Sequence, residues 1–411
     1  MAWDSIMYFL KRLVPALIII YVFLNPYPHT TAIKEISFYS SILIVIFLVV
    51  GNNISFSFRS PLTILFVLFS GWVLGNLFFA INPQNSFHDF YAHLLKYLVL
   101  FYLLINFIYS PRHLKILIWS VIISSFFFSV FGIFYYYVTL DYSFNMRFGL
   151  PGVAAVNNVG MITVPAFLFS INALFFENKP LRVTFLITCV ITTLIGSLLT
   201  QTVGILLAMV VAVSILLMRK LKVLIVVLSL LAITVGFMPF HSRVGYDGLL
   251  QKIKADDRTQ LWYVYSRMIE RKPFIGYGFG MSLYSEDSFV SGFDDVLSKT
   301  PDKYKPSYYQ TPHNIFIDMA VRTGIGGLAL FLAIVSTFIY MGLKLARNGG
   351  STFIRSWALC ILSLLISFLI QGVFADVLFG PYWVIFFVIL GMMSVLWRLD
   401  TRLERAENSD Y

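Results

Sequence analysis

His313 is the residue best placed for acid–base chemistry, because it lies in the motif Thr-Pro-His-Asn at residues 311–314, where an apolar segment begins. An imidazole takes up and releases a proton near neutral pH, so it could activate or orient a hydroxyl group. Asp318 and Arg322 follow with i, i+4 spacing and could pair along one face of a helix. From spacing alone, an interfacial histidine that only meets lipid headgroups is an equally good interpretation.

Arg258 and Trp262 lie one helical turn apart in a segment, residues 258–271, whose apolar spacing predicts a short amphipathic helix. A guanidinium can hold a phosphate through paired hydrogen bonds, and an indole ring can stack on a cation or a sugar. Taken without context, a surface arginine paired with Asp256 or Asp257 is the favoured interpretation.

Charged residues in or beside apolar segments are further candidates, since a charge is costly inside a membrane. Lys96 lies within an apolar run, although its side chain could extend to the interface. Arg147 precedes Asn157 in a short loop where basic residues are otherwise scarce, which favours a local anionic partner. Asp376 belongs to the same group, and each of these residues is weak evidence by itself.

The chain lacks the motifs of nucleotide and metal chemistry. Residues 276–280 alternate glycine with aromatic residues, but they follow Lys272 and Pro273 rather than a strand, so we expect them to allow a tight return of the chain to the membrane. There is no Walker A loop, no Gly-x-Ser-x-Gly motif and no carboxylate cluster with metal-ligand spacing. The sequence therefore predicts neither a cofactor nor a bound metal.

The elements that must position these residues follow from composition. The chain has 411 residues, of which 59% are hydrophobic and 12% are charged, whereas about one quarter of a soluble domain is charged. Such a chain could not cover a globular surface with polar groups, so a soluble or disordered protein is excluded. The net charge of +10 is interpreted as a topology signal, and we expect membrane lipids and no nucleic acid as partners.

Twelve apolar segments approach the length that a helix needs to cross a bilayer, about 20 residues. They predict an all-α polytopic membrane protein with about twelve transmembrane helices and one large loop between helices nine and ten. The approximate cores are 7–25, 36–50, 62–80, 92–109, 116–139, 159–176, 183–200, 203–218, 222–238, 319–343, 355–375 and 381–397. The expected organisation is helices one to nine in 1–238, a periplasmic loop in 239–312, helices ten to twelve in 313–397 and a cytoplasmic tail in 398–411.

The distribution of basic residues predicts the orientation. With a cytoplasmic N-terminus, the cytoplasmic loops hold 16 Lys and Arg residues and the short outer loops hold only Lys34 and Arg147. Cytoplasmic loops collect positive charge, so this ratio predicts that both termini are cytoplasmic.

Four motifs together resemble the signature of the O-antigen ligase and polymerase superfamily. They are Arg258-Thr-Gln-Leu-Trp262, Lys272-Pro-Phe-Ile-Gly-Tyr-Gly-Phe-Gly280, Pro312-His313-Asn314 and Arg322-Thr-Gly-Ile-Gly-Gly327. The resemblance implies a membrane glycosyltransferase of the GT-C type in the bacterial inner membrane. Such enzymes take a glycan from undecaprenyl diphosphate on the periplasmic side, without a metal or a nucleotide.

The resemblance also implies roles for individual residues. His313 becomes the catalytic residue that activates the acceptor, and Arg258 becomes the residue that binds the diphosphate. The other substrate-binding candidates are Trp262, Arg147, Lys96, Asn314 and Arg322. One position departs from the pattern, because Val203 stands where the superfamily commonly carries an arginine in the outer turn between helices seven and eight. Lys96 and Arg147 are the residues that could compensate.

Three functions remain open at this point. A ligase would attach the glycan to lipid A–core, which is the leading hypothesis, and a polymerase would attach it to a growing lipid-linked glycan. A transporter or flippase is the alternative from another class. The absence of an internal repeat and the clustering of candidate residues on the outer side weigh against transport.

Overall fold

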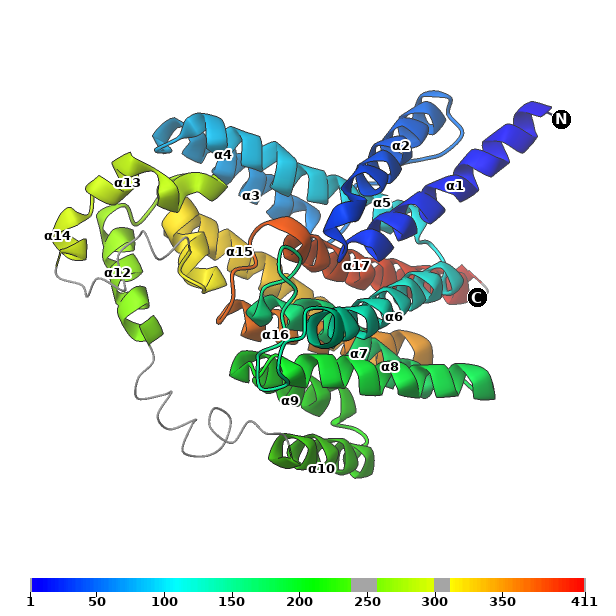
Figure 1. Cartoon of the computed structure of the whole chain (residues 1–411). Coiled ribbons are helices and arrows are strands. Elements are labelled where there is room, and N and C mark those ends of the chain that lie inside the picture. The colour runs from blue at the N-terminus through cyan, green and yellow to red at the C-terminus, as the bar shows by residue number, and fades with distance from the viewer. Residues whose placement is uncertain (1, 238–256, 299–310, 410–411) are drawn as a thin grey trace.

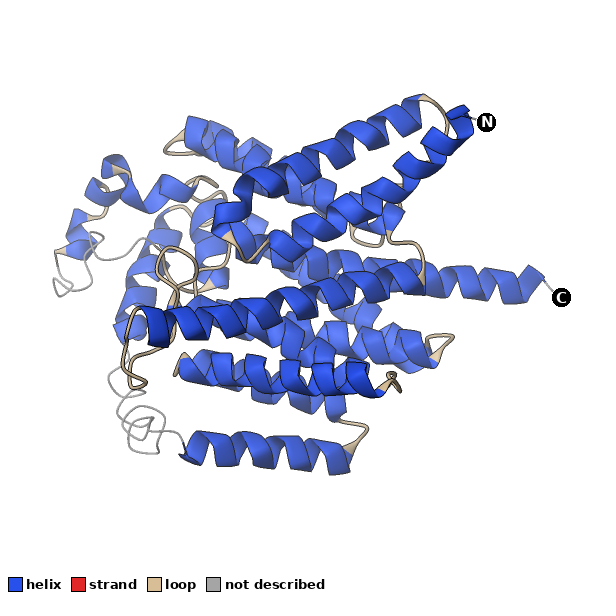
Figure 2. Cartoon of the chain, turned by 45° about the vertical axis from the view of Figure 1, so that its right-hand side comes forward, coloured by secondary structure: helices blue, strands red, loops and turns tan. Residues whose placement is uncertain are grey.

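The computed structural model describes residues 2–237, 257–298 and 311–409. Within these ranges the chain is built from helices joined by loops, without a β-sheet (Figure 1, Figure 2). In both views the two chain termini lie at one end of the helix bundle, and the short helices α12, α13 and α14 lie at the opposite end. We call these the termini end and the loop end.

The N-terminal part of the chain supplies nine long helical segments. They are α1 (Ala2–Leu24), α2 (Thr31–Val50), α3 (Thr63–Asn76), α4 (Pro83–Asp89) continued by η3 (Phe90–Leu95) and α5 (Lys96–Phe107), α6 (Pro111–Phe134) continued by η4 (Tyr135–Thr139), α7 (Val159–Leu174), α8 (Pro180–Leu199), α9 (Val203–Leu217) and α10 (Leu221–Phe237). Three single 3-10 turns accompany them: η1 (Pro28–Thr30), η2 (Leu77–Phe79) and η5 (Val156–Asn158).

The C-terminal part combines short surface helices with three long ones. The short elements are α12 (Asp257–Arg271), η6 (Met281–Ser285), α13 (Asp287–Ser291) and α14 (Asp294–Leu297). The long elements are α15 (Ile315–Asn348), α16 (Thr352–Gly372) and α17 (Gly380–Ser409). The last of these continues through the residues assigned to a tail from position 398 onward.

Nine helical runs in the described residues are long and apolar enough to cross a membrane, and three shorter apolar helices lie within Thr63–Phe79, Val203–Leu217 and Leu221–Ala232. Each of the twelve predicted apolar segments overlaps one of these helices. The prediction of an all-α polytopic membrane protein is confirmed.

The centre of the bundle is formed by α7, α16 and α17. Nearly every residue of α7 is buried, and Trp383 of α17 stacks on Phe386 within the same core. α17 packs along α5, while α16 packs against α7, α9 and α15. α10 is more peripheral, consistent with its exposed apolar side chains Ile225 and Leu230.

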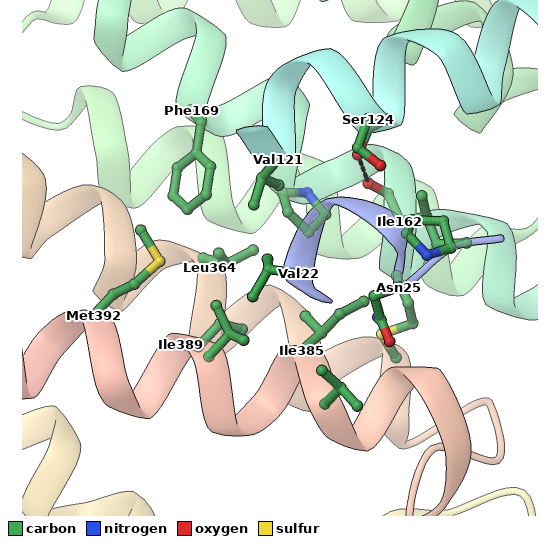
Figure 3. Close-up of a pocket in the computed structure, with 16 residues that line it drawn as sticks. Val22, Asn25, Val121, Ser124, Ile162, Phe169, Leu364, Ile385, Ile389 and Met392 are labelled. Carbon is green, nitrogen blue, oxygen red and sulfur yellow. Dashed lines mark hydrogen bonds between the residues drawn. The ribbon is translucent and has the colours of Figure 1, made fainter. Parts of the chain in front are cut away.

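A small cavity of about 40 Å³ lies between α1, α6, α7, α16 and α17 (Figure 3). Figure 3 shows Val22, Leu364 and Ile389 converging on it from three different helices. Sites for small molecules usually measure about 300–1,000 Å³, so this cavity is a packing defect of the core rather than a place for a sugar. The polar side chain of Asn25 at the edge of the cavity already has a hydrogen-bond partner, since its amide donates to the carbonyl of Pro381 at 2.9 Å.

Candidate active site at the loop end

The glycine-rich segment 276–280 crosses α15 at a break in that helix. Gly324 interrupts the helix with φ 70°, a conformation that favours glycine. The backbone N–H of Tyr277 donates to the carbonyl of Val321 at 3.0 Å, and that of Gly278 donates to Arg322 at 2.9 Å. A Cβ at Gly276 would stand 2.5 Å from the backbone nitrogen of Gly324. The glycines therefore permit a close backbone crossing next to the candidate residues.

α3 binds carbonyl groups of both chains of the crossing, in α15 at the break and in the segment that passes over it. The indole N–H of Trp72 donates to the carbonyl of Thr323 at 2.8 Å, and the Asn76 amide donates to the carbonyls of Ile275 and Arg322. Broken helices are tolerated at membrane depth only where other groups satisfy the backbone in this way. These bonds fix the N-terminal part of α15, residues 315–323, in place.

Arg322 and Asp318 form a buried ion pair, as their spacing predicts, with Nε and Oδ1 2.6 Å apart. The Arg322 guanidinium also donates to the carbonyl of Gly280 and lies over the rings of Tyr284 and Phe379 at 4.7 and 4.8 Å. The side chain of Arg322 is only 1% exposed. It therefore holds the loop-end segments together and is not placed to contact a substrate.

Tyr284 completes this cluster by donating its hydroxyl to Oδ1 of Asp318 at 2.5 Å. Its pKa lies well above the usual range, mainly because it is buried and also because the charge of Asp318 is close. Asp376 lies between α16 and α17, near the same charged groups. Its pKa is raised to about 6, mainly by burial and also by the charge of Asp318, while the charge of Arg322 lowers it. Sequence reasoning missed Tyr284, since no spacing relates a loop tyrosine to a helix 34 residues away.

His313 precedes α15 and does not lie in its first turn. Asn314 is the N-cap, and its side-chain oxygen accepts from the backbone N–H groups of Phe316 and Ile317 at 3.0 and 3.2 Å. His313 adopts φ 48°, in the left-handed region, where non-glycine residues are uncommon and tend to occur at functional sites. Helix ten was expected to begin at residue 313, but α15 begins at Ile315 because Asn314 takes the capping role.

Thr311 and Trp262 both contact the short loop that carries His313. The Thr311 hydroxyl lies 3.5 Å from Nδ1 of His313, at the upper limit of a hydrogen bond. The indole N–H of Trp262 donates to the carbonyl of Pro312 at 3.2 Å. This bond connects α12 directly to the residue before His313, so the structure brings Trp262, His313 and Asn314 together.

α12 has the amphipathic register that the sequence predicts. Leu261, Tyr265 and Met268 are buried against η6 and α13, while Trp262 and Ile269 are half-buried. Arg258 belongs to the first turn of α12, but its side chain lies outside the described residues.

Arg147 reaches across to the turn between α8 and α9. Its Nε donates to the carbonyl of Thr200 at 3.0 Å, and its Nη2 donates to the hydroxyl of Thr202 at 2.8 Å and to Oδ1 of Asn157 at 3.1 Å. A guanidinium is thereby fixed beside Val203, the first residue of α9. The side chain is half-buried.

Lys96 is placed differently. Its ammonium nitrogen lies 2.6 Å from each of the two carboxylate oxygens of Glu35 in α2. The rings of Phe38 and Tyr39 flank the ammonium at 5.4 and 5.9 Å. The charge of Lys96 is therefore neutralised by a neighbouring helix, and the residue joins α5 to α2.

In the described ranges, no group of three or more His, Cys, Asp or Glu side chains is close enough to hold an ion.

The fold and this site define a multi-pass α-helical membrane protein with a histidine-bearing loop at one end of the bundle. Residues 183–332 match a family model described as O-antigen ligase; they include Arg258, Trp262, His313, Asn314 and Arg322 but not Lys96, Arg147 or Asp376. The resemblance to the O-antigen ligase superfamily is confirmed for this segment.

Two curated proteins share part of the chain. A protein of Rickettsia typhi, provisionally named a polysaccharide ligase, is 26% identical over 153 residues, 37% of this chain and 35% of that protein. A second, from Rickettsia prowazekii and with the same provisional name, is 32% identical over 85 residues, 21% of this chain and 20% of that protein. The chain thus aligns with about a third and a fifth of these relatives.

Proposed function

We propose that the protein is a membrane glycosyltransferase that moves a glycan from a lipid diphosphate to an acceptor at the loop end. The donor is undecaprenyl-diphosphate-linked glycan, and the acceptor is lipid A–core in the leading form of the proposal. The loop end faces the periplasm in the bacterial inner membrane, and both termini face the cytoplasm. The match to the O-antigen ligase model and the placement of the candidate residues support this proposal.

The chemistry requires two groups. The acceptor hydroxyl needs a base or an orienting hydrogen-bond acceptor, and the diphosphate leaving group needs positive charge as the glycosidic bond breaks. His313 supplies the first. Its left-handed backbone conformation and the bond from Trp262 to Pro312 hold the imidazole in a defined loop.

Arg147 supplies part of the second requirement. The superfamily commonly carries an arginine at the position of Val203, and Arg147 brings a guanidinium to the same turn from another loop. Arg258, one helical turn before Trp262, is the second phosphate ligand in this proposal. Lys96 is removed from the donor site because Glu35 neutralises it, and Arg322 becomes a positioning residue.

One observation carries the proposal. Two contacts at the loop end join the four motifs in pairs: α12 contacts the His313 loop through Trp262, and the glycine segment contacts α15 through Tyr277 and Gly278. A transporter would need no such assembly at one end of the bundle.

Purified protein incubated with undecaprenyl-diphosphate glycan, with and without lipid A–core and with no nucleotide, tests this function. Glycan transfer to the core is expected for the ligase. Longer lipid-linked chains would instead indicate the second form, a repeat-unit polymerase. No transfer in either mixture would refute the enzyme and leave the transporter.

Two histidine-to-asparagine variants, one at His313 and one at a control position, test whether His313 is the catalytic group. Asparagine tolerates a left-handed backbone, so His313→Asn should keep the loop conformation while removing the imidazole. We expect transfer to fall by at least about 100-fold, the upper part of the range for general base catalysis. His29→Asn makes the same change at an exposed histidine of the loop end and should leave the rate unchanged. Similar rates for both variants would remove His313 from the mechanism.

A further inference from the structure

A second pocket lies at the termini end, opposite to the candidate active site. It has a volume of about 510 Å³ and is formed by α6, the end of α7, the start of α8 and α16. Its rim carries Arg112, Lys115 and Arg182, and its walls include Trp119, Phe176 and Trp357. Cationic groups around an aromatic hollow of this size fit an anion with an apolar part.

The charge of the pocket is positive. Glu177 also lines it, but this carboxylate is already bonded to Arg182 at 3.2 Å and accepts from the backbone N–H of Lys179. In the described part of the chain, Arg112 and Lys115 have no carboxylate partner, although Lys115 lies over the ring of Phe353 at 5.2 Å. Three cations against one carboxylate leave a net charge of about +2 for an anionic ligand.

Trp357 provides an independent indication of a ligand. Trp357 is only 3% exposed, yet its indole N–H has no acceptor among the described residues. An unmade hydrogen bond of a buried donor costs about 1–3 kcal/mol. The ring lines the pocket and stacks on Phe176 with centroids 6.4 Å apart, so an oxygen atom of a bound anion would supply the missing acceptor.

Polar contacts lie beside the pocket at the termini end. Ser356 of α16 donates to Asn172 of α7 at 2.7 Å beside it, and Asp400 of α17 accepts from Gly350 at 2.8 Å at the same end. The basic residues of this end predict that it faces the cytoplasm. Basic pockets between transmembrane helices on that side can bind anionic lipid headgroups.

We infer that this pocket binds the phosphate headgroup of an anionic phospholipid. Arg112 and Lys115 hold the phosphate at the rim, the indole N–H of Trp357 donates to one of its oxygens, and Trp119 with Ile116 and Ile123 flanks the acyl chains. The inference does not depend on the proposed transfer reaction, because the two sites lie at opposite ends of the bundle.

Lipid binding to the purified full chain tests the inference. Native mass spectrometry in detergent would compare retention of phosphatidylglycerol with that of phosphatidylethanolamine. We expect clear preference for phosphatidylglycerol, and the double variant Arg112→Gln with Lys115→Gln should bind it at least about tenfold more weakly, since each basic residue contributes to attraction of anionic lipid. The variant Arg219→Gln with Lys222→Gln removes the same charge from two exposed positions, one before α10 and one in its first turn, and should bind normally.

Trp357→Phe separates binding from folding. Loss of an unsatisfied donor offsets part of the cost of the smaller ring, so the unfolding temperature of lipid-free protein should change little, while retention of phosphatidylglycerol falls several-fold. Equal binding of both lipids, an equal loss in the Arg219 and Lys222 control, or unaltered binding by Trp357→Phe would each overturn the inference. Displacement of the lipid by millimolar glycerol phosphate or inorganic phosphate would also overturn it, by indicating a soluble anion instead.

Discussion

At the scale of single residues, Arg147 and Lys96 illustrate what sequence can and cannot decide. Both were candidates to replace a guanidinium at position 203, and nothing in their spacing distinguished them. The structure separates them, because Glu35 lies 2.6 Å from Lys96 while Thr200 and Thr202 accept hydrogen bonds from Arg147. The two hydrogen bonds of Arg147 join residues 53 and 55 positions apart in the sequence. No short-range sequence pattern could predict them.

We predict that Arg147→Ala lowers kcat/KM for the lipid-linked donor by about 10- to 100-fold, since hydrogen bonds to charged groups contribute about 1.5–3 kcal/mol. Adding Val203→Arg to this variant should restore part of the activity, because it returns a guanidinium to the same turn. Steady-state kinetics with varied donor concentration measures both effects.

A purely structural role for Arg147 gives a different pattern. Its bonds to Thr200 and Thr202 also hold the turn between α8 and α9, so Arg147→Ala is expected to lower the unfolding temperature as well. If Val203→Arg fails to recover activity and the KM for the donor stays constant, Arg147 is a positioning residue only.

Asp376 makes stability depend on pH. Its carboxyl has a pKa raised to about 6, mainly by burial, so the folded state holds this proton more tightly than the unfolded chain does. The stabilisation is complete below about pH 4 and is lost as the pH rises through about 6, with a magnitude of about 3 kcal/mol. Asp376→Asn should remove this component and raise the unfolding temperature at pH 7.

Thermal unfolding between pH 4 and pH 8 measures the effect of Asp376. Asp287→Asn makes the same substitution at an exposed aspartate of the loop end and should leave the pH profile unchanged. Parallel profiles for Asp376→Asn and the unmodified protein would contradict the assignment.

At the scale of elements, the crossing of segment 276–280 over α15 was predicted in part. The motif indicated the tight turn but not the helix that the turn contacts. The glycines were interpreted as a tight return of the chain, and Gly276 indeed has φ 73°. The partner of the crossing was not predictable, because a glycine at position 324 inside an apolar run reads as an ordinary helix residue. The break at Gly324 and its satisfaction by Trp72 of α3 depend on tertiary contacts alone.

Gly324→Ala and Gly276→Ala should each destabilise the protein by roughly 2–4 kcal/mol, because a Cβ is strained at positive φ and would contact the opposing backbone. Gly71→Ala in α3 is the matched control: its φ is ordinary and no atom lies within 4 Å of the added Cβ. We expect it to be neutral or slightly stabilising, since alanine favours a helix more than glycine does.

Unfolding temperature in detergent and the yield of folded protein measure these three variants. Equal stability of Gly324→Ala and Gly71→Ala would show that the crossing tolerates a side chain and that the break in α15 is not required.

At the scale of the whole molecule, hydropathy predicted the architecture well because each spanning helix must satisfy its backbone internally and face lipid or other helices. All twelve apolar segments became helices, and the amphipathic pattern of α12 was correct. The site was predicted less completely. The motifs identified His313 and Trp262, but the capping role of Asn314 and the burial of Arg322 follow from packing that sequence spacing does not contain.

The orientation of the bundle is the prediction that belongs to this scale. Single cysteines at Ser143 and Ser285, exposed positions of the loop end, should react with a membrane-impermeant thiol reagent in intact spheroplasts. Cysteines at Asn178 and Asn348, exposed positions of the termini end, should react only after the membrane is opened. The native Cys189 and Cys360 are both buried and should contribute little background. The reverse labelling pattern would place the candidate site in the cytoplasm.

The bonds from α3 to the break in α15 have a consequence for synthesis. Trp72 is translated 251 residues before its acceptor, Thr323. At about 5–20 residues per second, the indole waits roughly ten seconds to a minute for that carbonyl. A nascent chain that ends just after His313 would contain Arg258, Trp262 and His313 but would still lack the acceptor carbonyl of Thr323. We therefore expect the crossing at Gly324, and the site beside it, to assemble only after the first part of α15 has been synthesised.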